Sequence, residues 1–334
     1  MEYVSIPGID MKASRIGLGT WAIGGFWWGG PDDDNALRTI QAALDSGINF
    51  IDTAPVYGIG HSEELVGQAV AAYGKRDKVI IATKFGLNVN AEGGRRDSRP
   101  EFIREELENS LKRLQMDYID LYQVHWPDTL TPFEETAAAL VDLQKEGKIR
   151  AIGVSNFSTK QMNSFRAGAM ISTLQPPYNI FEQEAGVELL PYAEANNIAV
   201  LAYGSLCRGL LSGRMTPNTV FGADDLRGGA DPKFQPGRFE QYLEAVAELD
   251  KLAKAKFGKT VMQLAIRWVL DEGVEVALVG ARRPEQLEPL PGVMGWSIDA
   301  ETKREIASIV SAKVKDPCQP DFMAPPEQPW KNPA

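Results

Sequence analysis

Cysteine and histidine are scarce in this sequence. Cys207 and Cys318 are the only cysteines among 334 residues, and there are two histidines. Two cysteines so far apart exclude a disulfide-dense secreted domain and a four-cysteine metal site. The two histidines cannot assemble the His-rich ligand set of a metal-dependent hydrolase, although a metal site built from carboxylates stays open as an alternative. We expect no metal.

Long apolar runs and an excess of basic charge are also missing. No apolar run approaches the ~18 residues of a transmembrane helix, and residues 1–10 lack the pattern of a signal peptide. Lys and Arg number 35 against 45 Asp and Glu, and the resulting net charge of −10 argues against a nucleic-acid partner. We therefore expect a cytoplasmic protein without membrane or nucleic-acid partners, and its oligomeric state stays open.

The length allows either two domains of ~150 residues or one α/β barrel of ~250 residues or more. Eight short apolar runs alternate with amphipathic stretches, and their nearly continuous hydrophobicity is typical of strands covered on both faces. The runs are 15–19, 48–51, 79–82, 118–124, 149–154, 171–174, 198–202 and 274–279. This rhythm favours a single (β/α)8 TIM barrel over residues 1–334 and disfavours an open doubly wound sheet.

The segments between these runs carry apolar residues at helical spacing. The predicted helices are 33–46, 62–72, 100–114, 132–145, 159–166, 184–195 and 260–270. Ser62 is expected to cap the second helix, and residues 98–101 resemble a capping box with Pro100 in the first turn.

Three segments stand outside the repeat. Residues 1–14 predict an N-terminal β-hairpin, and residues 314–334 form a tail with six prolines. The glycine-rich segment 207–239 follows the seventh strand, and a loop of that length is usually functional.

Residues 17–22 formally match the dinucleotide fingerprint GxGxxG, but no helix begins there, as a Rossmann fold would require. We interpret them as a glycine turn at the end of a barrel strand. Trp21, Trp27 and Trp28 follow on the same loop. Clustered tryptophans either pack together or line a small-molecule pocket, and the sequence leaves both possibilities open.

Four side chains of different chemistry fall at the C-terminal ends of neighbouring strands, where barrels build active sites: Asp52, Tyr57, Lys84 and His125. Taken alone, each side chain has an ordinary structural explanation. The aspartate could cap a helix or turn, the tyrosine could be a packing ring, the lysine could reach solvent and the histidine could be a core residue. Together they form a proton donor for carbonyl reduction. The ammonium of Lys84 is expected to lower the pKa of the Tyr57 phenol, while neutral histidine orients the carbonyl.

These side chains lie in motifs that resemble the aldo-keto reductases. Residues 50–58 (FIDTAPVYG) resemble the family signature together with Gly60, Ser62, Glu63 and Gly67, and residues 153–157 (GVSNF) also match. Residues 21–25, 31–35 and 322–326 are most similar to bacterial NADP-dependent glyceraldehyde and aldose reductases. The resemblance implies that Tyr57 is the general acid, tuned by Lys84 and Asp52, and that His125 orients the carbonyl.

The resemblance further implies NADPH/NADP+ as cofactor. Ser155, Asn156 and Gln175 would hold the nicotinamide carboxamide, and Tyr203 would stack on its ring. Backbone amides of 204–211 would cradle the pyrophosphate. The full cofactor set is Gly19, Thr20, Trp21, Asp52, Ser155, Asn156, Gln175, Tyr203, Gly204, Ser205, Leu206, Arg208, Gly209, Leu211, Gly280, Arg282, Arg283 and Gln286.

Cofactor preference depends on the end of the eighth strand. Arg282 and Arg283, with Gln286, resemble the site for the 2′-phosphate, and guanidinium groups suit a phosphate. The other reading is an exposed basic pair at a helix start. Pro289 and Leu290 replace the acid and asparagine that many relatives place against adenine, so the adenine contacts are expected to differ.

The substrate pocket is predicted from Trp21, Tyr57, His125 and Trp126. Aromatic rings beside polar loop groups suit a small polyhydroxylated or sugar-derived aldehyde, either glyceraldehyde-like or a hexose 6-aldehyde. We expect an NADPH-dependent oxidoreductase that reduces this aldehyde to an alcohol. The alternative is a nucleotide-sensing regulatory module of the same fold with negligible turnover.

Overall fold

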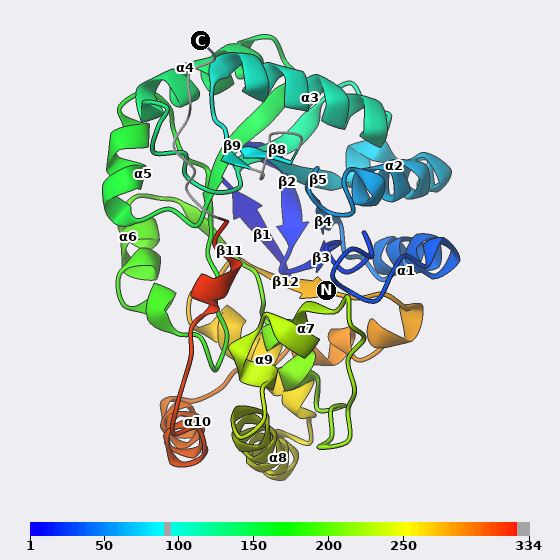
Figure 1. Cartoon of the computed structure of the whole chain (residues 1–334), viewed down its shortest axis with the longest axis vertical. Helices are drawn as coiled ribbons and strands as arrows, with labels where there is room; N and C mark the ends of the chain where they lie inside the picture. Colours follow the sequence, from blue (N-terminus) through cyan, green and yellow to red (C-terminus); the bar gives the residue numbers. More distant parts are fainter. Residues whose placement is uncertain (90–94, 326–334) are drawn as a thin grey trace.

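The computed structural model describes residues 1–89 and 95–325, and its centre is a closed barrel of eight parallel strands (Figure 1). The strands are β3 (Ile16–Gly19), β4 (Phe50–Asp52), β5 (Ile80–Phe85), β8 (Ile119–Val124), β9 (Ile149–Ser155), β10 (Thr173–Gln175), β11 (Ala199–Ala202) and β12 (Val276–Gly280). The pairing of β12 with β3 closes the sheet. Each predicted apolar run overlaps one of these strands, so the predicted barrel is confirmed.

Helices surround the barrel (Figure 1). They are α1 (Asp33–Asp45), α2 (His61–Tyr73), α3 (Pro100–Leu114), α4 (Phe133–Lys145), α5 (Thr159–Arg166), α6 (Leu189–Ala195), α7 (Leu226–Gly229), α8 (Arg238–Phe257), α9 (Val261–Asp271) and α10 (Ala300–Lys313). Short 3-10 turns are η1 (Arg76–Lys78), η2 (Glu184–Gly186), η3 (Cys207–Ser212), η4 (Pro232–Phe234), η5 (Pro284–Gln286), η6 (Leu290–Val293) and η7 (Pro320–Met323).

The sequence analysis missed α7, α8 and α10, and it joined η2 and α6 into one helix at 184–195. Neither predicted side-chain cap is present, although Pro100 does lie in the first turn of α3 as predicted. Gly60 caps α2 with a φ of 91°, and the Ser62 hydroxyl instead donates to Thr20. α3 begins after Arg99, and the backbone N–H of Ser98 donates to Asp128. A glycine suits the α2 cap because its backbone is left-handed there.

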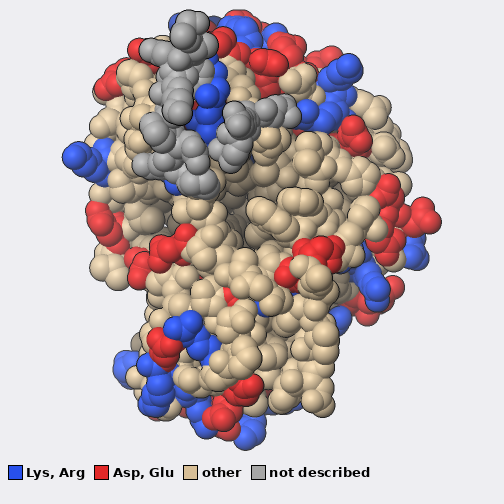
Figure 2. Space-filling view, viewed as in Figure 1, with Lys and Arg blue, Asp and Glu red and all other residues tan. Residues whose placement is uncertain are grey.

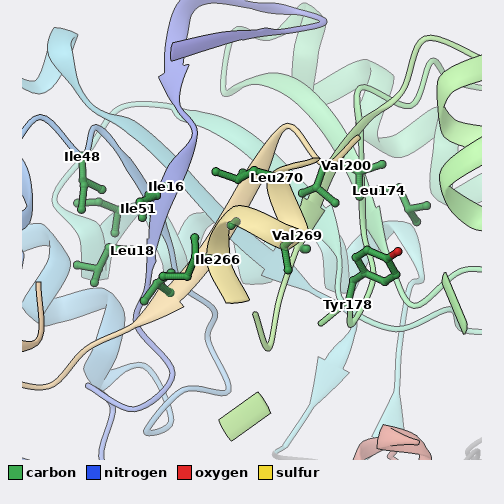
Figure 3. Close-up of a cluster of buried hydrophobic side chains, with 14 of the residues drawn as sticks. Ile16, Leu18, Ile48, Ile51, Leu174, Tyr178, Val200, Ile266, Val269 and Leu270 are labelled. Atoms are coloured by element: carbon green, nitrogen blue, oxygen red, sulfur yellow. The ribbon is translucent and has the colours of Figure 1, made fainter. Parts of the chain in front are cut away.

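The main core lies between the barrel and its helices. In Figure 3, Ile266, Val269 and Leu270 of α9 point at the sheet, near Val200 and Ile16. The buried face of α9 follows the helical repeat of its apolar residues, and burial of each such side chain contributes roughly 1.5–3 kcal/mol.

A smaller apolar cluster fills the barrel interior and is closed by the hairpin of β1 (Tyr3–Ile6) and β2 (Ile9–Ser14). Ile6, Ile9 and Ala13 of the hairpin pack with inward-facing residues such as Phe50 and Leu121. The predicted hairpin is therefore present, with a turn at residues 7–8. The hairpin covers the N-terminal end of the barrel. A ligand can therefore enter at the opposite end, where the strands finish.

The long segment after β11 is not structureless, since it contains η3, α7 and η4 before α8 begins. A short antiparallel pair, β6 (Leu87–Asn88) with β7 (Arg95–Arg96), follows β5. The tail runs through η7 to residue 325, and the part of the predicted tail at 326–334 lies outside the described residues. Within the described ranges, no helix is long and apolar enough to cross a membrane.

Candidate active site

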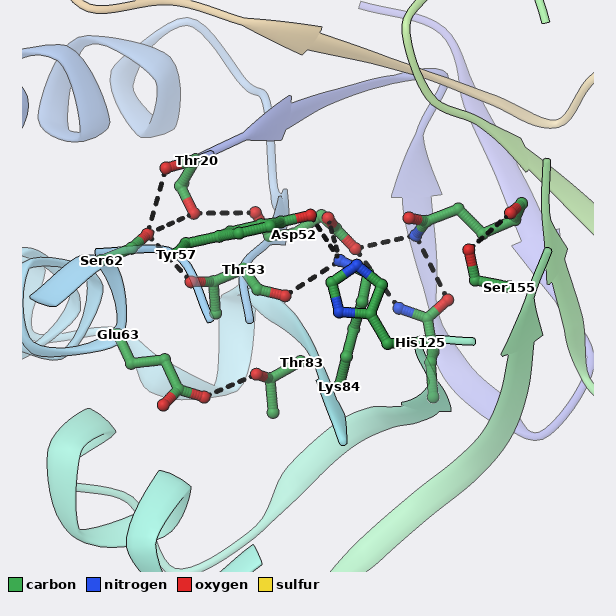
Figure 4. A network of polar contacts seen from close by, with 12 residues as sticks. Thr20, Asp52, Thr53, Tyr57, Ser62, Glu63, Thr83, Lys84, His125 and Ser155 are labelled. Atoms are coloured by element: carbon green, nitrogen blue, oxygen red, sulfur yellow. Dashed lines mark hydrogen bonds and ion pairs between the residues drawn. The ribbon is translucent and has the colours of Figure 1, made fainter. Parts of the chain in front are cut away.

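The predicted catalytic residues come together at the C-terminal end of the barrel. Asp52 ends β4, Lys84 lies on β5, and His125 directly follows β8. Tyr57 lies in the turn that leads from β4 to α2. Figure 2 shows the centre of this face hollowed, and Figure 4 shows the four side chains from close by.

Lys84 is the centre of the group and is fully buried. Its Nζ donates to Asp52 Oδ1 at 2.6 Å, to the Thr53 carbonyl at 3.0 Å and to the Tyr57 hydroxyl at 3.3 Å. Burial lowers the pKa of Lys84, and the Asp52 carboxylate opposes that shift. The lysine therefore joins the carboxylate to the phenol through one ammonium group.

The second carboxylate oxygen of Asp52 is held by amides. Gln175 Nε2 donates to it at 2.8 Å and Gln123 Nε2 at 3.3 Å. The sequence reading missed Gln123. The signal was its position two residues before His125, because alternate residues of a strand share a face. Gln175 was expected to hold the nicotinamide carboxamide, and here its side-chain N–H groups donate to Asp52 and, at 3.3 Å, to Gln123 Oε1.

The environment of Tyr57 corrects one expectation. Lys84 was expected to lower the pKa of this phenol, but burial, followed by the Asp52 charge, raises it well above its usual value. Removing the phenolate from water outweighs the ammonium 3.3 Å away. Tyr57 therefore stays a neutral phenol at physiological pH, which is the protonation state that a proton donor needs.

His125 is also held neutral. Burial, and then the charge on Lys84, lowers the pKa of His125 well below its usual value. The imidazole meets the Tyr57 ring edge-on, with 5.8 Å between the ring centroids. A neutral imidazole beside the phenol can donate to a carbonyl oxygen, as expected from the residue types.

Three buried hydroxyl groups support the end of β4. Thr20 Oγ1 donates to the Asp52 carbonyl at 2.9 Å, and the Ser62 hydroxyl donates to Thr20 Oγ1 at 2.7 Å. The Ser62 and Thr53 hydroxyls lie 3.0 Å apart (Figure 4). This network fixes the backbone of residues 52–53, whose carboxylate and carbonyl hold Lys84. Thr20 was predicted to contact the cofactor, but its hydroxyl forms a hydrogen bond within the barrel.

The residues expected around the nicotinamide form one connected set. The Ser155 hydroxyl donates to the Gln175 carbonyl at 2.7 Å. Asn156 Nδ2 donates to the His125 carbonyl at 2.9 Å, and Asn156 Oδ1 accepts from the Tyr203 hydroxyl at 3.0 Å. The set thus joins the Tyr203 ring to the catalytic group.

Two glycines lie side by side at the ends of β3 and β12. Gly19 and Gly280 are paired in register, and a Cβ added to either would still be 3.8–4.0 Å from its nearest neighbour. Two adjacent glycines leave bare backbone at this edge, which suits close approach of a flat ligand. The two predicted glycines are therefore compatible with a dinucleotide at the strand ends.

The loop predicted to cradle the pyrophosphate offers free amides at only part of its length. Within the described part of the chain, the backbone N–H groups of Ser205, Leu206 and Arg208 have no hydrogen-bond acceptor. Those of Gly209 and Leu211 donate to the Leu206 carbonyl. The Cys207 N–H donates to the Gly204 carbonyl, so the amides free to fit an anion such as a pyrophosphate are those of residues 205, 206 and 208.

Side chains in this loop serve the protein interior. Arg208 is buried and pairs with Glu182 and Asp231, and the Lys233 ammonium lies 2.8 Å from Glu182. Leu211 is buried in the main core. Arg208 and Leu211 can therefore meet a cofactor through backbone alone. Gly204, which precedes the free amides, has a φ of 68° and accepts from Asn179 at its carbonyl.

The two arginines after β12 have different surroundings. Arg282 donates to the Trp28 carbonyl and, at 2.5 Å, to the Gly30 carbonyl, whereas Arg283 is exposed. Gln286 Oε1 accepts the backbone N–H groups of both arginines, at 2.7 and 3.0 Å. The sequence analysis treated the two arginines as equivalent. In the structure, Arg282 is bonded to the loop between β3 and α1, whereas the Arg283 side chain is exposed. Pro289 and Leu290 stand where many relatives place residues against adenine. Of these two, Leu290 is buried in the core.

The tryptophans divide between packing and exposure. Trp21 stacks on Tyr57 with 6.1 Å between centroids, and Trp28 meets Trp21 edge-on at 5.3 Å. Trp27 is 52 % exposed and contacts Phe26. Trp126 follows His125 and lies under the Arg96 guanidinium. Trp21 therefore contacts the catalytic tyrosine and Trp28 contacts Trp21, while the roles of Trp21 and Trp126 in a substrate pocket stay predictions.

Comparison with known proteins agrees with this geometry. Residues 15–311 match the model of the aldo/keto reductase family. The chain is 57 % identical to the aldo-keto reductase YhdN of Bacillus subtilis over 327 residues, which cover 98 % of each protein. It is 36 % identical to the NADH-specific methylglyoxal reductase of Escherichia coli, covering 92 % of this chain and 98 % of that one.

Among solved structures, the glycerol dehydrogenase AKR11B4 of Gluconobacter oxydans superposes with a TM-score of 0.85 at 54 % identity, covering 96 % of this chain and 99 % of the other. The barrel, the row of Asp52, Lys84 and Tyr57, and the family model covering most of the sequence all lead to the same assignment. The chain belongs to the aldo-keto reductase family of oxidoreductases.

Proposed function

We propose that this aldo-keto reductase uses NADPH to reduce the aldehyde of a small polyhydroxylated or sugar-derived compound to an alcohol. The observation that carries the proposal is the contact row from Asp52 through Lys84 to the hydroxyl of Tyr57, with neutral His125 at the ring of Tyr57. This row supplies a proton beside a hollow at the end of the barrel.

The chain's own residues account for the proton side of the reaction. NADPH, when bound, supplies the hydride that the carbonyl carbon receives. Tyr57 gives its hydroxyl proton to the carbonyl oxygen, and Lys84 stabilises the phenolate left behind. Asp52 keeps the ammonium charged and aimed, and His125 orients the carbonyl by donating a hydrogen bond. The products are the alcohol and NADP+.

The substrate class rests on the mouth of the site. Stacked tryptophan and tyrosine rings pack well on the C–H faces of a sugar-like molecule, and Trp21 already stacks on Tyr57. Two similar proteins are named for small oxygen-rich compounds, glycerol and methylglyoxal. Glyceraldehyde-like compounds and hexose 6-aldehydes are therefore the proposed substrates.

The preference for NADPH rests on Arg283, which is exposed next to the end of β12 and able to meet a 2′-phosphate. One similar protein is named NADH-specific, so the preference needs its own test. We expect a lower KM for NADPH than for NADH, and the Arg283→Met variant should lose most of that difference. Equal KM values in the unaltered protein would contradict the preference.

The direct test of function is NADPH oxidation by the purified protein, followed by absorbance, with glyceraldehyde and with a hexose 6-aldehyde. Turnover that survives EDTA supports the proposal. Tight NADPH binding with negligible turnover on both would support the regulatory module instead. The described residues contain no group of three His, Cys, Asp or Glu placed to hold a metal ion, and loss of activity in EDTA would favour a metal-dependent hydrolase.

A further inference from the structure

A buried ion cluster supports the loop that carries the free backbone amides. Its members, each at most 7 % exposed, are Glu182, Arg208, Asp231 and Lys233. Glu182 lies between β10 and α6, Arg208 on η3, and Asp231 and Lys233 at η4. Arg208 pairs with both carboxylates, and the Lys233 ammonium lies 2.8 Å from Glu182. The cluster therefore joins three separate segments of the chain.

The four charges of the cluster balance, two positive against two negative. Burial alone would raise the pKa of Glu182, but the charges of Arg208 and then Lys233 outweigh it and lower that pKa. Glu182 therefore stays charged. Because buried charges are tolerated only when they are paired, removal of one member would weaken the hold on the others.

The loop is attached to this cluster at both ends of the stretch with free amides. Asn179 Nδ2 donates to the Gly204 carbonyl at 3.0 Å and to Glu182 Oε2 at 2.6 Å. At the other end, the Arg208 side chain enters the cluster directly. The free N–H groups of residues 205, 206 and 208 lie within the stretch that these two attachments bound.

The backbone of this stretch is strained. Cys207 has a φ of 46° and Arg208 a φ of 51°, so both are left-handed although neither is glycine. Such a conformation persists only where the surrounding structure imposes it. A glycine at position 208, like Gly209 with its φ of 94°, would adopt this conformation without strain. The arginine instead brings a side chain whose ion pairs hold the strained backbone in place.

We propose that Asp231 is a positioning residue for the cofactor, which holds the Arg208 guanidinium and thereby fixes the amides of residues 205, 206 and 208 at the pyrophosphate. The inference rests on the proposed function, which supplies the cofactor. Asp231 has no exposed surface and lies 23 residues beyond Arg208, so it acts on the cofactor through Arg208 alone. The fold of the long segment after β11 is thereby coupled to cofactor affinity.

The test is the Asp231→Asn variant, studied by calorimetry without turnover. Asparagine keeps an Oδ1 acceptor for the Lys233 backbone N–H, now 3.0 Å away, and removes the charge that faces Arg208. Kd for NADP+ should rise about tenfold, the value of one weakened hydrogen bond to an anion. Kd for adenosine 2′-monophosphate, which has no pyrophosphate, should stay within about twofold.

The matched control is Asp316→Asn, which removes a surface ion pair with Arg238. The Asp316 side chain is 62 % exposed, and this substitution should change neither Kd.

The double variant Asp231→Asn/Lys233→Met separates positioning from stability. It removes one charge of each sign and leaves Glu182 and Arg208 as a neutral pair, so it should resist urea better than Asp231→Asn. Arg208 still lacks its second carboxylate, so the NADP+ Kd should stay raised. In both variants, hydrogen exchange of the amides at 204–211 should be faster than in the unaltered ligand-free protein.

An unchanged NADP+ Kd in Asp231→Asn, an equal rise for both ligands, or an NADP+ Kd restored in the double variant would each overturn the role of Asp231. If Asp231→Asn does not fold, the double variant carries the same comparison of the two ligands. A wild-type protein that binds NADP+ but reduces neither aldehyde would refute the proposed function instead, and calorimetry would still decide the role of Asp231.

Discussion

Replacing Lys84 with methionine would test whether the buried ion pair is the structural centre of the site. The substitution keeps the unbranched stem and removes the ammonium. Asp52, only 3 % exposed, would keep amide donors from Gln175 and Gln123 but lose its one cation at 2.6 Å. The Thr53 carbonyl would lose a donor at 3.0 Å.

The expected effect is large because one charge stays buried without its partner. Removing one member of a buried ion pair typically costs about 3–5 kcal/mol. The double variant Lys84→Met/Asp52→Asn removes both charges and leaves an acceptor oxygen for Gln175. It should therefore be more stable than Lys84→Met, with a coupling energy of roughly 1–3 kcal/mol.

Urea unfolding at neutral pH measures these free energies. Lys145→Met is the matched control, because the Lys145 side chain is 71 % exposed and its ion pair with Asp142 lies on the surface. Its loss should change stability by less than about 1 kcal/mol. A Lys84→Met protein as stable as this control, or a double variant whose loss equals the sum of the single losses, would refute the reasoning.

Two further predictions concern neighbours of this pair. The pKa of His125 is lower in the folded protein than in the unfolded chain, where it is near 6.5. The neutral His125 side chain therefore contributes its full stabilisation at any pH above about 6.5. Below pH 6.5, the free energy of unfolding should fall by up to about 1.4 kcal/mol per pH unit. Urea unfolding at pH 5.5–7.5 should show this slope in the unaltered protein and not in the His125→Asn variant. Identical slopes in the two proteins would contradict the prediction. The Gln123→Leu variant should have a reduced kcat, and the fold-change in kcat should exceed the fold-change in KM. An unchanged kcat would show that Gln123 does not support the catalytic residues.

The barrel could be predicted because its strands are buried on both faces. Nearly continuous apolar runs such as 198–202 favour buried parallel strands between amphipathic helices. The missed helix α8 begins at Arg238, directly after Gly237 with a φ of 85°. That glycine, and the prolines and glycines before it, read as one long loop, although η3, α7 and η4 interrupt the segment.

Local signals also failed where a side chain had a better use in the fold. Ser62 looks like a helix cap, yet its hydroxyl donates to Thr20, which directly follows β3 and precedes Ser62 by more than 40 residues. The hydroxyl network depends on tertiary contacts, so helix spacing could not reveal it. The loop at 204–211 was expected to meet the pyrophosphate through backbone amides, and nothing local in the sequence shows that the Arg208 side chain turns inward to pair with Glu182 and Asp231.

The four catalytic positions followed from barrel geometry and family resemblance, but their protonation did not. Residue types alone suggested that Lys84 would lower the pKa of Tyr57. Burial reverses that direction, since the desolvated phenolate loses more than the nearby ammonium returns. Burial depends on the finished fold, so a sequence pattern cannot supply it.

In the proposed reaction, the Tyr57 hydroxyl delivers the proton. Tyr57→Phe keeps the ring between Trp21 and His125 and removes a hydroxyl whose contact with Lys84 is long, at 3.3 Å. The decisive measurement is the turnover of Tyr57→Phe with saturating NADPH and aldehyde. We expect unchanged NADPH affinity and a fall in turnover of about 10²–10⁴-fold. Wild-type turnover in this variant would contradict the account.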